Sequence, residues 1–122
     1  MTGLEVIARA DDLAPNQYTP EQKIEWLSAL DQKIWNEVFA VHCDAEAPAY
    51  PEGYSSGEET LLIPAPYGWD VYSYHLLARV AEYNAEIAKY NLYATQFNAA
   101  YKEFCAWYNR THRPRQKGDW RF

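Results

Sequence analysis

The chain has 122 residues, of which 48% are hydrophobic and 23% are charged. This length corresponds to one domain, and this composition excludes a wholly disordered protein. No apolar run is long enough for a transmembrane helix, and the first residues lack the basic and apolar segments of a signal peptide. Cys43 and Cys105 have no cysteine partners at metal-binding spacing, so we expect a cytosolic protein with two free thiols.

The net charge of −6 is unevenly distributed along the chain. Residues 1–63 carry twelve acidic and three basic side chains, whereas residues 64–122 carry five acidic and eight basic ones. Most of the basic excess lies in the last thirteen residues. Such asymmetry bears on the geometry of partner binding and not on the fold.

The first predicted helix runs from Leu4 to Asp12. Leu4, Ile7 and Ala8 recur at the spacing of one helical face, so we expect that face to be buried. The segment Ala14-Pro15-Asn16 interrupts the pattern and ends the helix.

The second predicted helix has the clearest start signal. Thr19 is placed to cap it, Pro20 occupies the first helical position and Gln22 stands at the third, as in a capping box. We expect a helix over residues 20–41. Its apolar stripe comprises Ile24, Leu27, Ile34, Val38 and Val41.

Residues 43–60 predict a long acidic surface loop, with a β-hairpin as the less favoured alternative. The segment contains two prolines, two glycines and five acidic side chains without a basic one. A short extended run follows at Leu61-Leu62-Ile63. Pro64 and Pro66 end this run because proline disfavours helical backbone in the residue before it.

A helical pattern then extends from about residue 70 to Arg110. Ten apolar or aromatic residues alternate at spacings of four and three, which on its own describes one helix of about 40 residues. Helices in compact domains average only about 11–12 residues. We therefore expect a hairpin of two helices, over residues 70–83 and 86–110, with its turn at Tyr83-Asn84-Ala85.

These elements together predict an all-α fold: a small helical bundle with a long acidic loop and an extended basic C-terminal tail. Residues 1–110 form the single helical domain, and residues 111–122 form the tail, which Pro114 and Gly118 keep from being helical.

The sequence indicates no enzyme. None of the motifs for a serine nucleophile, a zinc protease, a phosphate-binding loop or a dinucleotide site is present. His42, His75 and His112 fall on three different elements without metal-ligand spacing. We therefore expect no catalytic residue, no cofactor and no metal site.

Two groups of residues are candidates for binding other chains. The basic tail combines guanidinium groups with aromatic rings, which suits either nucleic-acid phosphates or an acidic protein surface, although a disordered terminus is the alternative. Its predicted partner-binding residues are Arg110, Arg113, Arg115, Lys117, Trp120, Arg121 and Phe122.

The second group consists of aromatic residues that cover more than one face of the last helical region. One small domain cannot bury all these faces, so we expect part of the group to form a homo-oligomer interface. The alternative is that the rings pack within the subunit while their hydroxyls reach water. The predicted interface residues are Tyr72, Tyr74, Tyr90, Tyr93 and Trp107.

Five stretches, in this order, resemble the small head–tail connector (adaptor) proteins of long-tailed bacteriophages and of prophages in gut Firmicutes. They are Glu-Val-Ile-Ala-Arg-Ala-Asp-Asp at 5–12, Thr-Pro-Glu-Gln-Lys-Ile-Glu-Trp-Leu-Ser at 19–28, Leu-Leu-Ile-Pro-Ala-Pro-Tyr at 61–67, Phe-Asn-Ala-Ala-Tyr at 97–101 and Ala-Trp-Tyr-Asn-Arg-Thr-His-Arg-Pro at 106–114. The acidic loop has no counterpart in this resemblance.

The resemblance implies a structural virion protein that forms a ring, commonly of twelve subunits, below the portal. Such a ring completes the head for tail joining, and its C-terminal segment, here Arg110 to Phe122, tends to reach the portal. Portal and tail-completion proteins are the implied partners. The protein would assemble in the host cytoplasm and lie at the head–tail interface of the virion, where DNA passes without specific binding. The alternatives are a nucleic-acid-binding module that uses the basic tail, and another head- or tail-completion protein.

Overall fold

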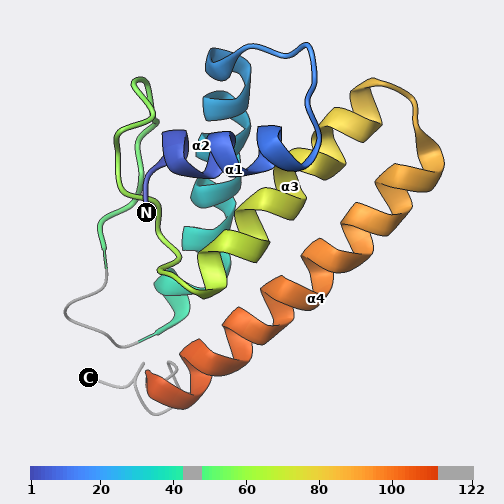
Figure 1. The fold of residues 1–122 in the computed structure, drawn as a ribbon. Coiled ribbons are helices and arrows are strands. Elements are labelled where there is room, and N and C mark those ends of the chain that lie inside the picture. Colours follow the sequence, from blue (N-terminus) through green and yellow to red (C-terminus); the bar gives the residue numbers. More distant parts are fainter. Residues whose placement is uncertain (43–47, 113–122) are drawn as a thin grey trace, which may run out of the picture.

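The computed structural model describes residues 1–42 and 48–112, and it is an all-α bundle, as predicted (Figure 1). Its helices are α1 (Gly3–Leu13), α2 (Pro20–Glu37), the 3-10 helix η1 (Phe39–Val41), α3 (Tyr67–Tyr83) and α4 (Ile87–Thr111). The described residues include an antiparallel β-bridge between Thr2 and Thr60. Most of the predicted basic tail, residues 113–122, and part of the acidic loop, residues 43–47, lie outside the described residues.

Helix α1 begins at a complete capping box. The Thr2 hydroxyl accepts a hydrogen bond from the Glu5 backbone, and the Glu5 carboxylate accepts one from the Thr2 backbone. The predicted buried face is wrong in part, because Leu4 and Ala8 are exposed while Val6 and its neighbours are buried. This short helix carries apolar residues on two faces, and only the face that packs against α2 and α3 is buried. The buried face comprises Gly3, Val6, Ile7 and Ala10.

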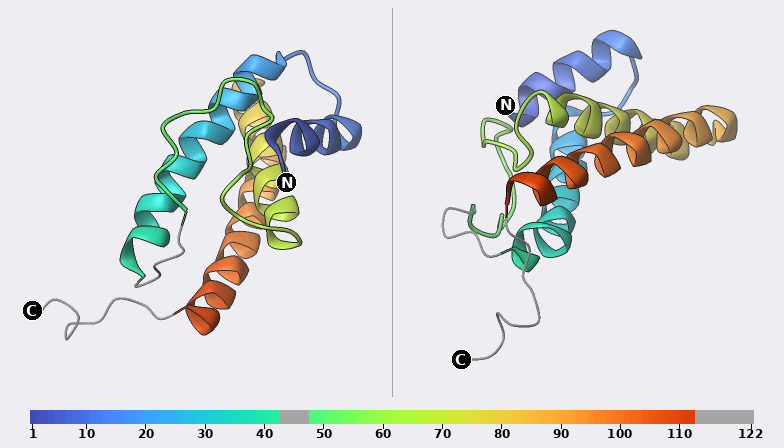
Figure 2. Two further views of the ribbon diagram at one scale, coloured as in Figure 1. Left: turned by 90° about the vertical axis from the view of Figure 1, so that its left-hand side faces the viewer. Right: turned by 90° about the horizontal axis from the view of Figure 1, so that it is seen from below.

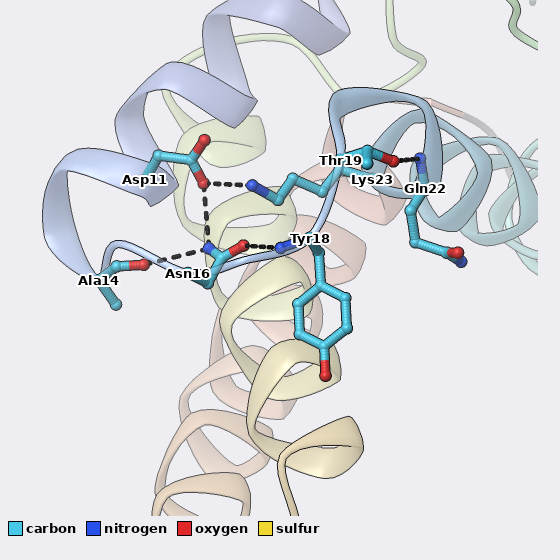
Figure 3. Close-up of polar contacts among 7 residues, drawn as sticks. All are labelled: Asp11, Ala14, Asn16, Tyr18, Thr19, Gln22 and Lys23. Carbon is cyan, nitrogen blue, oxygen red and sulfur yellow. Dashed lines mark hydrogen bonds and ion pairs between the residues drawn. The ribbon is translucent and has the colours of Figure 1, made fainter.

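The connection from α1 to α2 is ordered by one asparagine (Figure 3). The Asn16 amide donates to the Asp11 carboxylate and to the Ala14 carbonyl, both at 3.2 Å, and its side-chain oxygen accepts from the Tyr18 backbone at 3.1 Å. Asp11 also forms an ion pair at 2.8 Å with Lys23, whose side chain is only 3% exposed. Asp11 thereby fixes the end of α1 against the second turn of α2.

Helix α2 starts as predicted and ends earlier than predicted. The Thr19 hydroxyl accepts a hydrogen bond from the Gln22 backbone at 3.2 Å, and Pro20 is the first helical residue. The helix ends at Glu37, after which the chain tightens into η1, so that the predicted end at Val41 is four residues too late. This change of geometry buries Phe39 in place of Val41, which is 46% exposed.

The last helical region is a hairpin, so the prediction of two helices is confirmed. Helices α3 and α4 pack side by side in antiparallel directions, and Figure 1 shows the turn at the far end of the molecule from α4's last turn. Ala85 has a φ of 58°, a left-handed conformation that reverses the chain. Asn84 precedes it and accepts hydrogen bonds at 2.8 Å from the Gln17 amide and the Tyr18 hydroxyl. These contacts from the α1–α2 connection hold the turn in place.

The core lies between α1, α2, α3 and the C-terminal half of α4. In the whole of α4 only Phe104 and Tyr108 are buried, whereas α3 contributes nine buried residues. Figures 1 and 2 show the reason, because α4 runs away from α2 toward the hairpin turn and leaves its first half beside α3 alone. The largest fully buried side chains are those of Tyr72, Phe104, Leu27, Ile34, Ile63 and Leu76.

Residues 48–63, which we call the strap, lie along α2 and carry irregular backbone (Figure 2). Side chains of α2 bind the strap backbone. The Trp35 indole donates to the Pro48 carbonyl at 2.8 Å, the Gln32 amide donates to the Pro51 carbonyl at 3.2 Å, and the Ser28 hydroxyl accepts from the Tyr54 backbone at 3.1 Å. This part of the predicted surface loop is therefore attached to the helix by its own backbone.

A buried carboxylate joins the strap to two helices. Asp31 of α2 is fully buried and accepts hydrogen bonds from the hydroxyls of Tyr54 and Tyr72, both at 2.5 Å, and from the Leu62 backbone at 3.1 Å. The Tyr72 hydroxyl in turn accepts one from the Ile63 backbone at 2.9 Å. Burial raises the pKa of Asp31, although these hydrogen bonds act in the opposite direction. Periodicity gave no sign that Asp31 would be buried, because Asp is normally placed on the exposed face of a helix.

Candidate functional site

An open groove of about 300 Å³ lies between α2, α3 and α4. It exists because α2 and α4 both pack against α3 and approach each other at one end, where the Tyr101 hydroxyl donates to the Glu37 carboxylate at 2.7 Å. Toward the hairpin turn the two helices separate (Figure 1). The lining residues are Trp26, Ala29, Leu30, Lys33, Ile34 and Glu37 of α2, His75 and Arg79 of α3, and Phe97 and Tyr101 of α4.

The groove combines apolar walls with a few polar groups. Trp26, Leu30 and Phe97 supply the apolar surface, and His75 lies 5.6 Å from the Phe97 ring between centroids. Burial, with the nearby Arg79 charge, lowers the pKa of His75 to about 4, so its imidazole is neutral at pH 7. The exposed side chain of Lys33 adds a cation at the rim. This chemistry suits an apolar side chain or ring accompanied by an acidic group.

An aromatic cluster borders the groove beside the hairpin turn. The rings of Trp26 and Tyr83 stack at 5.4 Å between centroids, and Tyr18 packs edge-on to Trp26 at 5.6 Å. The Arg79 guanidinium lies 5.2 Å from the Tyr83 ring centre and forms an ion pair at 2.8 Å with Glu82. Cation–π contacts of this kind position Arg79 at the open end of the groove.

The hairpin tip, which we define as residues 83–92, exposes large apolar side chains. Ile87 is 73% exposed, Tyr83 56% and Leu92 55%. Ile87 lines a separate hollow at the turn, together with Ala81, Glu82, Ala85, Glu86 and Tyr90. The exposed apolar side chains of the hairpin tip are therefore a feature distinct from the groove.

The predicted oligomer-interface residues divide into two kinds. Tyr72 is wrong as an interface residue, because its ring is 0% exposed and its hydroxyl binds Asp31 inside the subunit. Tyr74, Tyr90 and Tyr93 are half-buried, and so is Trp107, which stacks on Tyr67 at 5.1 Å between centroids. For these four residues an interface role stays a prediction.

Sequence reasoning concentrated on rings and missed the aliphatic part of the exposed surface. Ile87 belongs to the predicted apolar seam of the hairpin and was expected to be covered, whereas Leu92 lies outside that seam. The separation of α4 from α2 explains both cases, because the first half of α4 lies beside α3 alone. The one sequence signal for this exposed surface was an apolar residue outside the seam, such as Leu92.

The predicted partner-binding residues of the tail mostly lie beyond the described part of the chain. Arg110 is exposed on the last turn of α4. The other six, at positions 113, 115, 117, 120, 121 and 122, lie outside the described residues. Their partner-binding role stays a prediction.

Two of the three histidines meet at the end of α4. The His42 ring binds the Val38 carbonyl at 2.5 Å and the Asn109 side chain at 2.8 Å, and it packs edge-on to Tyr108. The His112 ring stacks on Tyr108 at 3.8 Å between centroids. This stack joins η1 to α4, while His75 lies apart in the groove.

Within the described residues no three His, Cys, Asp or Glu side chains are grouped so that they could hold a metal ion. Cys105 is half-buried, and burial raises the pKa of its thiol, whereas Cys43 lies outside the described residues. The helices of residues 1–42 and 48–112 include none that is both long and apolar enough to cross a membrane. Compared with models of protein families, with curated proteins and with solved structures, the chain matches none.

Proposed function

We propose that this protein is a structural subunit of a bacteriophage virion, a head–tail connector (adaptor) that assembles into a ring below the portal and completes the head for tail joining. The proposal rests first on the five sequence stretches that resemble this family. Residues 5–12 lie in α1, residues 19–28 include the start of α2, and residues 97–101 lie in α4. An all-α subunit agrees with the helical ring proteins that the resemblance implies.

The observation that carries the proposal is the exposed apolar surface of the hairpin tip. Three large side chains within ten residues of chain, at 83, 87 and 92, are more than half exposed. Single exposed apolar residues are ordinary on a monomer, but three large ones so close in the chain offer surface to neighbouring subunits. Ile87 and Leu92 are five positions apart on α4, so they face directions about 140° apart and suit contacts on two sides. A ring subunit buries such surface against its neighbours.

The distribution of charge supports the same proposal. Acidic side chains predominate in residues 1–63, and basic ones predominate from Arg110 to the end of the chain. Two unlike surfaces on one subunit favour head-to-tail contacts, which generate rings when the rotation closes. In such a ring, acidic surface facing the channel would keep passing DNA mobile, and the basic tail would bind an acidic neighbour such as the portal.

The proposal is tested by measuring mass in solution. The purified protein is examined by native mass spectrometry alone and after mixing with a purified portal ring. We expect a ring-sized assembly, either alone or on the portal. A monomer of 14.2 kDa in both samples would contradict the connector function.

Two matched variants test the role of the tail. Arg113→Ala/Arg115→Ala removes two cations of the predicted partner-binding segment, and Lys89→Ala/Lys102→Ala removes two exposed cations of α4 instead. We expect only the first variant to lose portal binding, by at least about tenfold in affinity. Equal losses in both would mean that overall charge, and not the tail, drives the contact. Strong binding of duplex DNA that weakens steeply with salt would favour the nucleic-acid-binding alternative.

A further inference from the structure

We infer that the groove between α2, α3 and α4 binds a small aromatic molecule that carries one carboxylate. The site is separate from the surfaces invoked for ring assembly, and it needs no second copy of the chain. Its volume of about 300 Å³ stands at the lower end of the range for small-molecule sites. The groove therefore suits a compact ring system and not a stretch of polypeptide.

The groove has a buried floor and a half-buried aromatic wall. Trp26, Leu30 and Ile34 of α2 are at most 8% exposed, so they close the bottom and offer little surface of their own. Phe97 and Tyr101, which we call the α4 wall, are half-buried, and their rings stack at 5.8 Å between centroids. Aromatic rings pack favourably against such a pair. An aromatic ligand therefore has a specific surface to contact on the α4 side.

Two cations converge on the middle of the groove. Burial, together with the charges of Arg79 on α3 and Lys33 on α2, lowers the pKa of His75 to about 4 and keeps its imidazole neutral at pH 7. Both cations therefore act at the place where the imidazole lies. The two residues of the α4 wall are uncharged. Positive charge beside an aromatic surface selects a ring that carries an anionic group.

Lys33 is the cation that remains for a ligand. Arg79 is already paired with Glu82 at 2.8 Å, whereas no ion pair among the described residues includes Lys33. Glu37, the acidic residue of the lining, lies one turn further along α2 and accepts a hydrogen bond from Tyr101 at 2.7 Å. A carboxylate in the groove would therefore pair with Lys33 at the rim while its ring lies against the α4 wall.

Two other hollows in the described part of the chain have the opposite charge. The hollow at the hairpin turn, of about 280 Å³, includes Glu82 and Glu86 in its lining. The hollow between α2 and the strap, of about 470 Å³, includes Glu21 and Glu25. Neither lining contains a basic residue. An aromatic anion is disfavoured at both, so they serve as internal controls for the position of binding.

The inference is tested by titrating the full chain at pH 7 with 2-naphthoate and with the uncharged 2-naphthalenemethanol, followed by amide NMR spectra. We expect saturable changes at Ala29, Lys33 and Phe97, with a dissociation constant of about 1 mM or lower for 2-naphthoate. The uncharged compound should bind at least about threefold more weakly. Lys33→Gln should remove this preference. Lys102→Gln, at an exposed cation of α4 outside the groove lining, is the control and should keep it.

A second pair of variants and a histidine titration give independent readouts. Ala29→Phe fills the groove from an exposed position and should weaken binding of both compounds at least about tenfold. Ala99→Phe, exposed on α4 outside the lining, should leave binding unchanged. A bound anion also favours the charged imidazole. Saturating naphthalene-2-sulfonate, which stays ionised in acid, should therefore raise the pKa of His75 above about 4, as NMR of the imidazole measures.

Each outcome of these experiments decides the inference. The absence of saturable binding, equal affinity for the two compounds, or changes confined to the other two hollows would each overturn it. Circular dichroism checks that the variants remain folded. If Ala29→Phe does not fold, the two compounds compared on Lys33→Gln and Lys102→Gln decide alone. None of these results bears on the connector function, which is tested separately by mass in solution.

Discussion

The two ends of α3 meet very different surroundings. Near its start, the Tyr72 hydroxyl, the Asp31 carboxylate and the strap backbone at Leu62 and Ile63 form a buried network with every bond made inside the subunit. Near its end, Tyr83 and the neighbouring Ile87 of α4 are more than half exposed. The comparison indicates that one end of the hairpin holds the fold together, whereas the other leaves large apolar side chains exposed.

The largest effect is expected at the buried network. Asp31→Ala leaves the hydroxyls of Tyr54 and Tyr72 and the Leu62 backbone without the carboxylate that accepts their hydrogen bonds. We expect the free energy of unfolding to fall by about 3–5 kcal/mol. Urea denaturation measures the loss, and Asp31→Asn, which keeps one acceptor oxygen, should cost less. A loss under about 1 kcal/mol for Asp31→Ala would show that the network does not stabilise the strap end.

The two halves of α4 provide the next test. Phe104→Ala should cost about 3–5 kcal/mol because the ring is 0% exposed in the core. Phe97→Ala, seven residues earlier on the same helix, removes an identical ring that is only half-buried beside the groove, and we expect about 1–2 kcal/mol. Thermal or urea unfolding of the pair compares them directly. Equal losses would mean that α4 is packed evenly along its length.

The pH dependence of stability sharpens the comparison at His75. Its pKa is about 4 in the folded protein and about 6.5 in the unfolded chain, so the stability it contributes is present above pH 6.5 and is lost as the pH falls toward 4. Between pH 7.5 and pH 5 the wild type should lose about 2 kcal/mol more than His75→Gln, which cannot titrate. Urea unfolding of both proteins at the two pH values measures this difference. Parallel losses would place His75 in water rather than in the groove.

A smaller effect is expected at the hairpin turn. Ala85 has a φ of 58°, where a side chain is strained, and glycine adopts this conformation readily. Ala85→Gly should therefore raise the free energy of unfolding by about 0.5–1 kcal/mol, whereas Ala88→Gly, in the first turn of α4, should lower it. The melting temperatures of the two variants test whether this turn stores strain. A lower melting temperature for Ala85→Gly would contradict it.

The smallest effect on stability is expected at the hairpin tip. Ile87→Ser and Leu92→Ser remove side chains that are 73% and 55% exposed, so each should change the free energy of unfolding by less than about 0.5 kcal/mol. Under the proposed function both should nevertheless weaken self-association, as sedimentation velocity measures. A large loss of stability with unchanged association would reverse the assignment of this end of the hairpin.

Local signals accounted for much of the architecture. Thr19 and Pro20 predicted the start of α2. A single helix of about 40 residues would be unusually long, which predicted a turn near Asn84. The predicted buried face of α1 was partly wrong, because a short helix with apolar residues on two faces buries the one that other elements pack against. The predicted end of α2 was too late, because the change to a 3-10 helix after Glu37 depends on packing and not on the local pattern. The groove could not be predicted, since its residues come from three helices and its shape depends on how α4 separates from α2.

By itself the sequence determined the four α-helices, the cap of α2 and most of the apolar stripes, because hydrogen bonding within a helix and its periodicity are local properties. Only the tertiary structure decided which apolar residues remain on the surface and which acidic residue is buried. Ile87 and Leu4 are exposed, and Asp31 is buried, because burial depends on neighbours that are distant in the chain. For Asp31 those neighbours are Tyr54 of the strap and Tyr72 of α3. Among the described residues of this one subunit, none fully covers the side chains of Ile87 and Leu4.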